Sequence, residues 1–154
     1  MSAAVHRRCE ALPEVMGPGG TLMMPTRSWK NLNPSPGVHS PVPESKWQKL
    51  RDNRPPYDPQ LTPTNTMGAV AELFRKWPSA IRSMHPARSI AAPGPRAAFL
   101  TEHHELSNIF GPESPVDRLY QLNGKVVLLG VGYSKNTSLH LADPAQTIPP
   151  STTR

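Results

Sequence analysis

The pattern of apolar and polar residues along the chain predicts short helices and a few short strands. The segment MGAVAELFRKW, residues 67–77, carries apolar side chains at the spacing of one helix face, and Pro78 prevents its continuation. These side chains are Val70, Leu73, Phe74 and Trp77. The run KVVLLGVG, residues 125–132, is apolar almost without interruption, which is typical of a buried strand. The sequence therefore predicts a helix at 67–77 and an interior strand at 125–132.

Shorter patterns predict the remaining elements. Ser114, Pro115 and Asp117 form a helix start, with Ser114 as the N-cap. Proline-rich stretches such as NLNPSPGVHSPVP (31–43) predict extended loops. The other predicted elements are strands at 21–24 and 89–92 and helices at 44–52, 96–104 and 114–122. This order predicts an α/β fold, a mixed sheet flanked by helices, with proline-rich loops and a disordered tail at 143–154.

Composition and charge add the following limits. The chain has 154 residues, 20 prolines and 36% hydrophobic residues, so one domain with many loops is expected. The formal net charge is +6, but the basic residues are scattered singly or in pairs rather than in a run. A solvated basic surface therefore explains the charge, and we expect no nucleic-acid partner. A basic nucleic-acid-binding protein remains the distant alternative, which strong salt-dependent retention on DNA would reveal.

Cysteine content and hydropathy indicate in which cellular compartment the protein is expected. The single cysteine, Cys9, excludes an intramolecular disulfide and a thiolate metal cluster. The longest apolar run, 126–131, is far shorter than the roughly 20 residues that span a bilayer. The first residues also lack the continuous apolar stretch of a signal peptide. We therefore expect a soluble cytoplasmic protein with no membrane partner.

The residues after the apolar run are candidates for chemistry. KNTSLHLAD (135–143) places hydroxyl and amide side chains just before His140, an imidazole that can accept a proton near neutral pH. Asp143 lies three residues further on, where a carboxylate could orient the ring. The alternative is a histidine that is simply hydrogen-bonded at a strand end.

Two further motifs contain histidine. In SMHPARS (83–89), the residue His85 precedes a proline and is therefore expected in extended backbone, while the serines and Arg88 would suit a phosphate. An ordinary polar loop explains the same motif. In EHHE (102–105), adjacent histidines on a helix would point about 100° apart, and the metal-binding HExxH spacing is absent. We therefore predict no metal site.

Three stretches, in order, resemble one protein family. They are GTLMMPTRSWKNL, DPQLTPTNTMGAVAELFRKWPSAIRSMHPARSIAA and LTEHHELSNIFGPESPVDRLYQLNGKVVLLGVGYSKNTSLHLA. Together they are similar to the aminoglycoside 3-N-acetyltransferases, also called antibiotic N-acetyltransferases. The resemblance implies a partial family domain at 18–142, between an unmatched leader at 1–17 and a tail at 143–154. It also implies transfer of an acetyl group from acetyl-CoA to the 3-amino group of a deoxystreptamine antibiotic, without a metal.

The resemblance also implies roles for particular residues. His140, in Asn-Thr-Ser-Leu-His, corresponds to the family's catalytic histidine. Four residues correspond to positions that surround coenzyme A: Thr26, Ser83, His85 and Ser89. Because the antibiotic is a polycation, acidic side chains are also expected near it, and Asp58 and Asp143 are candidates.

The chain also departs from the family pattern. The family's Val-His-Ser-Ser-Leu type motif is missing before Gly20, and Asp143 stands where the family has Glu. Family members continue beyond the catalytic histidine with further strands. We therefore expect a sheet that is incomplete and a chain that is truncated at both ends relative to the family. An inactive fragment, with exposed sheet edges that favour aggregation, is the alternative to a working acetyltransferase.

Overall fold

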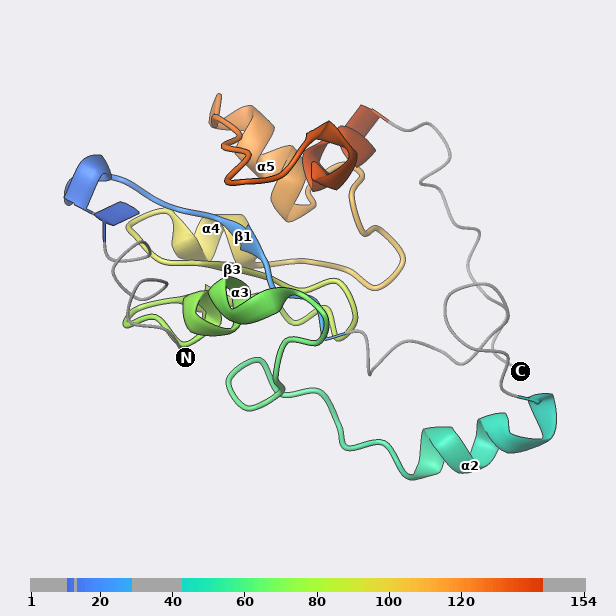
Figure 1. The fold of residues 1–154 in the computed structure, drawn as a ribbon. Helices are drawn as coiled ribbons and strands as arrows, with labels where there is room; N and C mark the ends of the chain where they lie inside the picture. The colour runs from blue at the N-terminus through green and yellow to red at the C-terminus, as the bar shows by residue number, and fades with distance from the viewer. Residues whose placement is uncertain (1–10, 13, 29–42, 143–154) are drawn as a thin grey trace.

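The centre of the fold is a small antiparallel sheet. The computed structural model describes residues 11–12, 14–28 and 43–142, and Figure 1 shows the arrangement of the elements. The strand order is β1 (Met24–Pro25), β3 (Ile90–Ala92), β2 (Ile81–Arg82). Met24 pairs with Ala91, and Ile81 pairs with Ala92, so β3 is the central strand and is hydrogen-bonded on both sides.

Helices cover this sheet. Both α3 (Gly68–Arg75) and α4 (Ala97–Thr101) pack against β3. Helix α5 (Pro115–Gln121) packs against α4 and against the 3₁₀ helix η3 (Thr137–Ala142). In Figure 1, α5 and η3 (orange to red) lie above the strands and α3 (green) lies below them, while α2 lies apart from the sheet. The helices after β1 are η1 (Glu44–Lys46), α2 (Trp47–Asp52), α3 (Gly68–Arg75), α4 (Ala97–Thr101), α5 (Pro115–Gln121), η2 (Tyr133–Lys135) and η3 (Thr137–Ala142). Residues 11–12 and 14–16, before β1, are also helical. The predicted α/β class, with helices flanking a sheet, is confirmed. Both strand pairs described are antiparallel, so the sheet is not the mixed one that was predicted.

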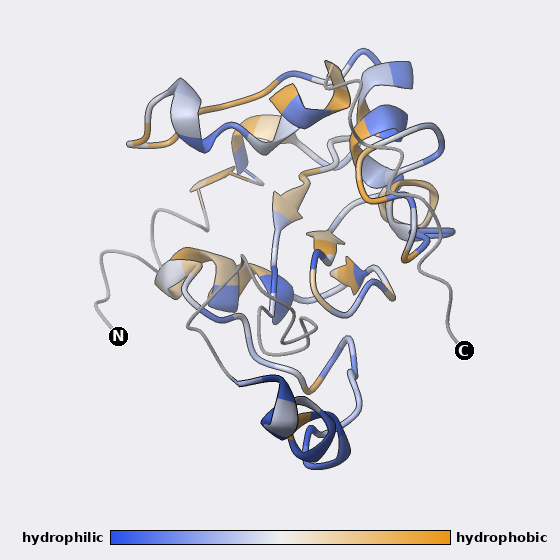
Figure 2. Cartoon of the chain, turned by 90° about the vertical axis from the view of Figure 1, so that its right-hand side faces the viewer, coloured by the Kyte–Doolittle hydropathy of each residue, from blue (hydrophilic) through white to orange (hydrophobic). Residues whose placement is uncertain are grey.

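The buried apolar side chains form two adjoining clusters around β3. One contains Ile90, Phe110 and Val116, and the other contains Ala92, Ala97 and Leu100. The alanines on β3 and α4 bring the two elements close together because they carry no side chain beyond Cβ. Figure 2 shows the contrast in composition, with apolar strands and a hydrophilic α2 at the lower end of the view. The apolar surface that these clusters bury is the main source of stability for this part of the chain.

Most of the predicted helices are confirmed. Helix α3 occupies 68–75 within the predicted 67–77, and Phe74 from its apolar stripe is buried. At the start of α5, the hydroxyl oxygen of Ser114 accepts a hydrogen bond from the backbone N–H of Asp117 at 3.3 Å, as the N-cap prediction required. In both cases the information is local, in the spacing of a few neighbouring residues.

The predicted interior strand at 125–132 is wrong. This segment has no strand backbone, and Val127 and Leu129 are 76% and 59% exposed. A strand is stable only when its backbone groups pair with a neighbouring strand. The central strand β3 already pairs with β1 on one side and β2 on the other, so it offers no free edge to residues 125–132. The apolar run therefore lies on the surface, beside β1 and α5.

Replacing Val127 with lysine distinguishes the two descriptions of this segment. We expect the free energy of unfolding to change by less than about 0.5 kcal/mol, because the side chain is already in solvent. In a buried strand the same change would cost several kcal/mol, because an unpaired ammonium would be buried. Urea unfolding measures the difference. The matched control is Val116→Lys at a 3% exposed position, which we expect to prevent folding.

Several predictions concern residues outside the described ranges. Cys9, Asp143, most of the leader and the tail lie outside the described ranges. Within residues 11–12, 14–28 and 43–142, no helix combines the length and the apolar character that crossing a membrane requires.

Candidate functional site

A buried guanidinium holds the strands and loops of the site together. Arg82, which is 6% exposed, donates from Nε to the hydroxyl oxygens of Thr26 at 3.2 Å and Ser89 at 3.1 Å. Its Nη2 donates to the Thr26 carbonyl at 2.5 Å, and its Nη1 donates to the Thr62 carbonyl at 2.5 Å. Thr26 and Ser89, two of the four residues predicted to surround coenzyme A, therefore accept hydrogen bonds from the same guanidinium.

Ser83 is hydrogen-bonded to a second buried histidine. The Ser83 hydroxyl lies 2.9 Å from Nδ1 of His104, and Nε2 of His104 lies 3.2 Å from the Ile109 carbonyl. A carbonyl can only accept, so Nε2 carries the proton in this arrangement and Nδ1 accepts from Ser83. The Ser83 oxygen in turn accepts from the backbone N–H of Ile90 on β3 at 3.0 Å. His104 thus joins the sheet to the loop between α4 and α5.

His85 lies against His104, with ring centroids 4.7 Å apart. Its Nδ1 accepts from the backbone N–H groups of Ala87 at 3.2 Å and Arg88 at 3.0 Å, which places the ring proton on Nε2. This Nε2 is buried and makes no hydrogen bond of ordinary geometry within the described part of the chain. The Leu106 backbone acts on this ring, but not at the geometry of an ordinary hydrogen bond.

Both buried rings are held in the neutral form. Burial lowers the pKa of His85 to about 4, the charge of Arg88 adds to the effect, and backbone groups of His85 and Leu106 partly oppose it. Burial likewise lowers the pKa of His104 to about 4, with a further contribution from His85. Neither imidazole is therefore charged at neutral pH.

His140 lies on η3 rather than at the end of a strand, so that part of the prediction is wrong. Its ring is exposed and stacks on Phe110, with centroids 4.9 Å apart and planes inclined by 17°. The first residue of η3, Thr137, accepts a hydrogen bond from Arg27 Nη2 at 3.0 Å. The imidazole is thus open to solvent while one apolar ring supports it.

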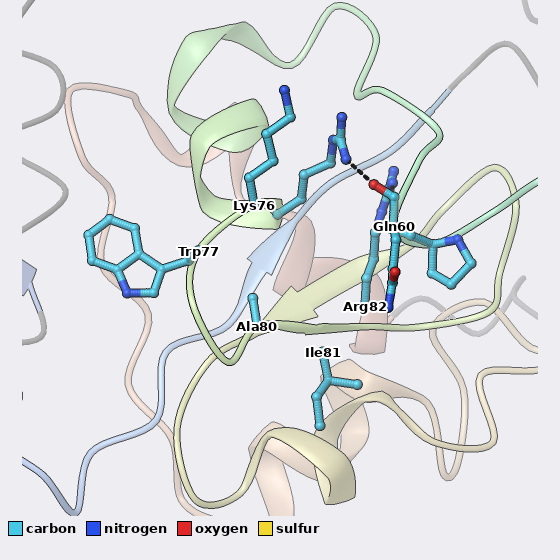
Figure 3. Close-up of a pocket in the computed structure, with 8 residues that line it drawn as sticks. Gln60, Lys76, Trp77, Ala80, Ile81 and Arg82 are labelled. Atoms are coloured by element: carbon cyan, nitrogen blue, oxygen red, sulfur yellow. Dashed lines mark hydrogen bonds between the residues drawn. The ribbon is translucent and has the colours of Figure 1, made fainter.

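Two hollows lie near these residues. A groove of about 180 Å³ lies between β1 and the segment 125–138, and Met24, Thr137 and Ser138 are among its lining residues. A larger hollow of about 450 Å³ lies on the α3–β2 side, between Gln60, Trp77 and Ile81 (Figure 3). The groove is the one to which η3 contributes lining residues, namely Thr137 and Ser138.

The cations around the larger hollow have partners within the protein. Arg75 donates from Nη1 to the Gln60 carbonyl, drawn as a dashed line in Figure 3, and from Nη2 to Glu72. Lys76 pairs with the same carboxylate at 3.0 Å. The charges that line this hollow are thus largely compensated, so it is the weaker candidate for a ligand site.

Comparison with known proteins identifies the family. Residues 3–154 match the family model described as aminoglycoside 3-N-acetyltransferase. The chain belongs to the aminoglycoside 3-N-acetyltransferase family. The expected resemblance is therefore confirmed.

Relatives of this family share the sequence and the fold. The chain is 36% identical over 135 residues to the aminoglycoside N(3′)-acetyltransferase-like protein YokD of Bacillus subtilis, covering 87% of this chain and 50% of that protein. The crystal structure of YokD superposes with a TM-score of 0.85, covering 92% of this chain and 57% of YokD. Aminoglycoside N(3)-acetyltransferase IX of Micromonospora chalcea is 41% identical over 135 residues, covering 86% of this chain and 47% of that protein.

A ligand-bound structure is also similar. AAC-IIIb, as a binary complex with CoASH, has 31% identity and a TM-score of 0.74, with 90% of this chain and 50% of that chain covered. The chain spans about half the length of the curated relatives it matches.

Asp58 and the EHHE motif have the following surroundings. Asp58 is half-buried, and its Oδ1 accepts from the backbone N–H groups of Gln60 and Leu61, so the carboxylate caps a turn. In the EHHE motif, His103 is exposed whereas His104 is buried. Helix α4 ends at Thr101, so the motif follows the helix and the predicted extension of that helix to 104 is wrong. No group of three or more metal-ligating side chains occurs among residues 11–12, 14–28 and 43–142.

Sequence reasoning missed four residues that organise the site. Arg82, His104, Arg27 and Phe110 make contacts with residues far away along the chain, such as Arg27 with Thr137. Because these partners are distant along the chain, no local pattern indicates the contacts.

Proposed function

We propose that this chain carries an acetyl-transfer site with His140 as the general base. The donor is acetyl-CoA, and the acceptor is the 3-amino group of an aminoglycoside. The observation that carries the proposal is the exposed imidazole of His140, which stacks on Phe110 and lies on the same 3₁₀ helix as Thr137 and Ser138, two lining residues of the groove at β1. Membership of the family and the similarity to a CoASH complex support the choice of donor and acceptor.

His140 supplies the step that the acceptor needs. An aliphatic amine is mostly protonated at neutral pH, and its nitrogen must lose a proton to attack a carbonyl carbon. One proton leaves the ammonium for solvent before the attack. As the neutral amine forms the C–N bond, the neutral imidazole takes a second proton from the nitrogen, and the C–S bond of the thioester breaks. The sulfur leaves with the bonding electrons and is reprotonated from the imidazolium or from water. Acetyl-CoA supplies an activated acyl group, so no covalent intermediate on the protein is required.

We assign Thr26, Ser83, His85 and Ser89 to the coenzyme A side of the site. The hydroxyls of the three residues other than His85 are engaged within the protein, so their contribution is to hold the backbone of β1 and β3 in place. His85 is different, because its buried Nε2–H lacks an ordinary acceptor among the described residues. An amide carbonyl or a phosphate oxygen of coenzyme A would satisfy this donor, so the residues fit such a ligand.

The acidic positions are proposed as contacts for the other ammonium groups of the antibiotic. Asp58 has one carboxylate oxygen committed to its own turn, which leaves the second for a cation. Asp143 lies outside the described residues, and its assignment follows from its place three residues after His140.

An acetyl-transfer assay tests the proposal. Purified protein is mixed with acetyl-CoA and sisomicin, and free thiol release is followed together with the mass of the antibiotic. We expect release that depends on the antibiotic and a product that carries one added acetyl group, which NMR places on the 3-amino nitrogen. A cooperatively folded protein that releases thiol at the same rate with and without antibiotic would overturn the proposal.

A further inference from the structure

We propose that Arg27 and Phe110 are positioning residues that hold His140 in its working orientation, an inference that rests on the proposed function. Phe110 sets the plane of the imidazole, and Arg27 fixes the turn that carries it. Neither residue needs to touch the substrate for this role. The stacking of Phe110 on the ring supports the first role, and the hydrogen bond from Arg27 to Thr137 supports the second.

Phe110 is a rigid support for an exposed ring. Its side chain is 4% exposed and packs with Ile90 on β3 and Val116 on α5. His104 Nε2 donates to the neighbouring Ile109 carbonyl, and its Nδ1 accepts from Ser83, which is bonded to Ile90 on β3. The loop that carries Phe110 is thereby anchored to the sheet. The centroid separation of 4.9 Å from His140 falls within the range of stacked aromatic pairs. The orientation of the imidazole is thus tied to the core.

Arg27 fixes the start of the 3₁₀ turn that bears His140. Arg27 directly follows the buried Thr26 after β1, and its Nη2 donates to the Thr137 hydroxyl at 3.0 Å. A 3₁₀ helix has three residues per turn, so side chains at Thr137 and His140 lie above one another on the same side. Fixing Thr137 therefore fixes the direction of His140.

The charge of Arg27 strengthens both contacts. Its guanidinium carbon lies 5.9 Å from the centroid of Phe110, within the range of a cation–π interaction. Burial, together with the charge of Arg88, lowers the pKa of Arg27 to about 10. The side chain therefore stays charged at neutral pH. Arg27 is in contact with both the support of the imidazole and the start of its turn.

Loss of this support should lower the rate rather than substrate affinity. An exposed imidazole on a free turn samples many orientations, and misplacement of a catalytic group by about 1 Å can cost on the order of 100-fold. We expect Phe110→Leu and Arg27→Gln each to lower kcat about 10- to 100-fold, with KM changed less than about threefold. Phe110→Tyr keeps the stacked ring and should retain most of the activity.

The NMR signals of the His140 ring provide a readout that does not depend on activity. Stacking on Phe110 shifts these protons upfield, and a His140→Gln variant assigns them. We expect Phe110→Leu to abolish the upfield shift and Arg27→Gln to reduce it, while Phe110→Tyr and the exposed control His103→Gln preserve it. Unchanged His140 shifts in folded Phe110→Leu and Arg27→Gln proteins would overturn the inference, as would unchanged kcat in both.

The two proposals fail in different ways. If the wild-type protein releases no thiol but the ring shifts respond as expected, the positioning contacts stand and the proposed function falls. If the wild-type protein is active but neither substitution changes the His140 shifts or kcat, only the positioning inference is wrong. Because Phe110 is in the core, Phe110→Leu is checked by thermal unfolding. Should that variant not fold, Arg27→Gln at its half-buried site decides the result.

Discussion

Substitution of His140 by glutamine is expected to lower kcat for acetyl transfer by about 10²- to 10⁴-fold, the range typical of losing a general base. The ring lies on the surface, so the folded structure should be retained and the melting temperature should change little. KM for acetyl-CoA should also change little, because the proposed coenzyme A residues lie on other elements. Steady-state kinetics of thiol release measure the effect. The matched control is His103→Gln, another exposed histidine, which should keep wild-type activity.

Comparing acceptor amines of different basicity tests whether His140 acts by removing a proton. A weakly basic acceptor amine is already neutral at pH 7 and needs less help in losing a proton. The loss of kcat in His140→Gln should therefore shrink when such an acceptor replaces a strongly basic aminoglycoside amine. An equal loss with both acceptors would show that His140 acts by binding or positioning. A variant with full activity towards sisomicin would remove the general-base assignment.

The parts of the fold that the sequence predicts are those specified by near neighbours. Helix α3 follows from an apolar stripe whose members are three or four residues apart, and α5 follows from a cap at Ser114. Strand β3 is predicted because Ile90–Ala92 is a short apolar run between polar residues. In each case the residues that determine the element lie within the element or next to it.

The errors arise where partners are distant along the chain. An apolar run such as 125–132 has the composition of a buried strand, but pairing depends on which backbone lies beside it, and composition does not contain that information. Strand β2 was missed because two residues, Ile81–Arg82, carry no pattern. The site shows the same limit. Arg82 reaches Thr26 across 56 residues, and nothing in the local sequence around either residue indicates the contact.

The buried histidine pair should make the protein sensitive to mild acid. His85 and His104 are neutral in the folded state, with pKa values lowered to about 4, and in the unfolded chain each would titrate near pH 6.5. Protonation therefore favours the unfolded state. Their contribution to stability is fully present above about pH 6.5 and is lost as the pH falls towards about 4. The slope is at most about 1.4 kcal/mol per pH unit for each histidine, or roughly 3 kcal/mol for the pair.

Urea unfolding at pH 7, 6 and 5 measures this loss in a window where carboxyl groups contribute little. Burial alone would raise the pKa of Glu72, but hydrogen bonds from Arg75, Thr64 and Lys76 outweigh it and lower the pKa, so its effect is confined to lower pH. His104→Gln should be less stable than wild type at pH 7, because it loses the shape of the imidazole, but its stability should fall about half as steeply on acidification. His103→Gln should keep the full slope, since that side chain is exposed. If the wild type and a folded His104→Gln variant lose stability equally between pH 7 and 5, then His104 is not held neutral by burial. The contacts that tie it to Ser83 and Ile109 would in that case tolerate its charge.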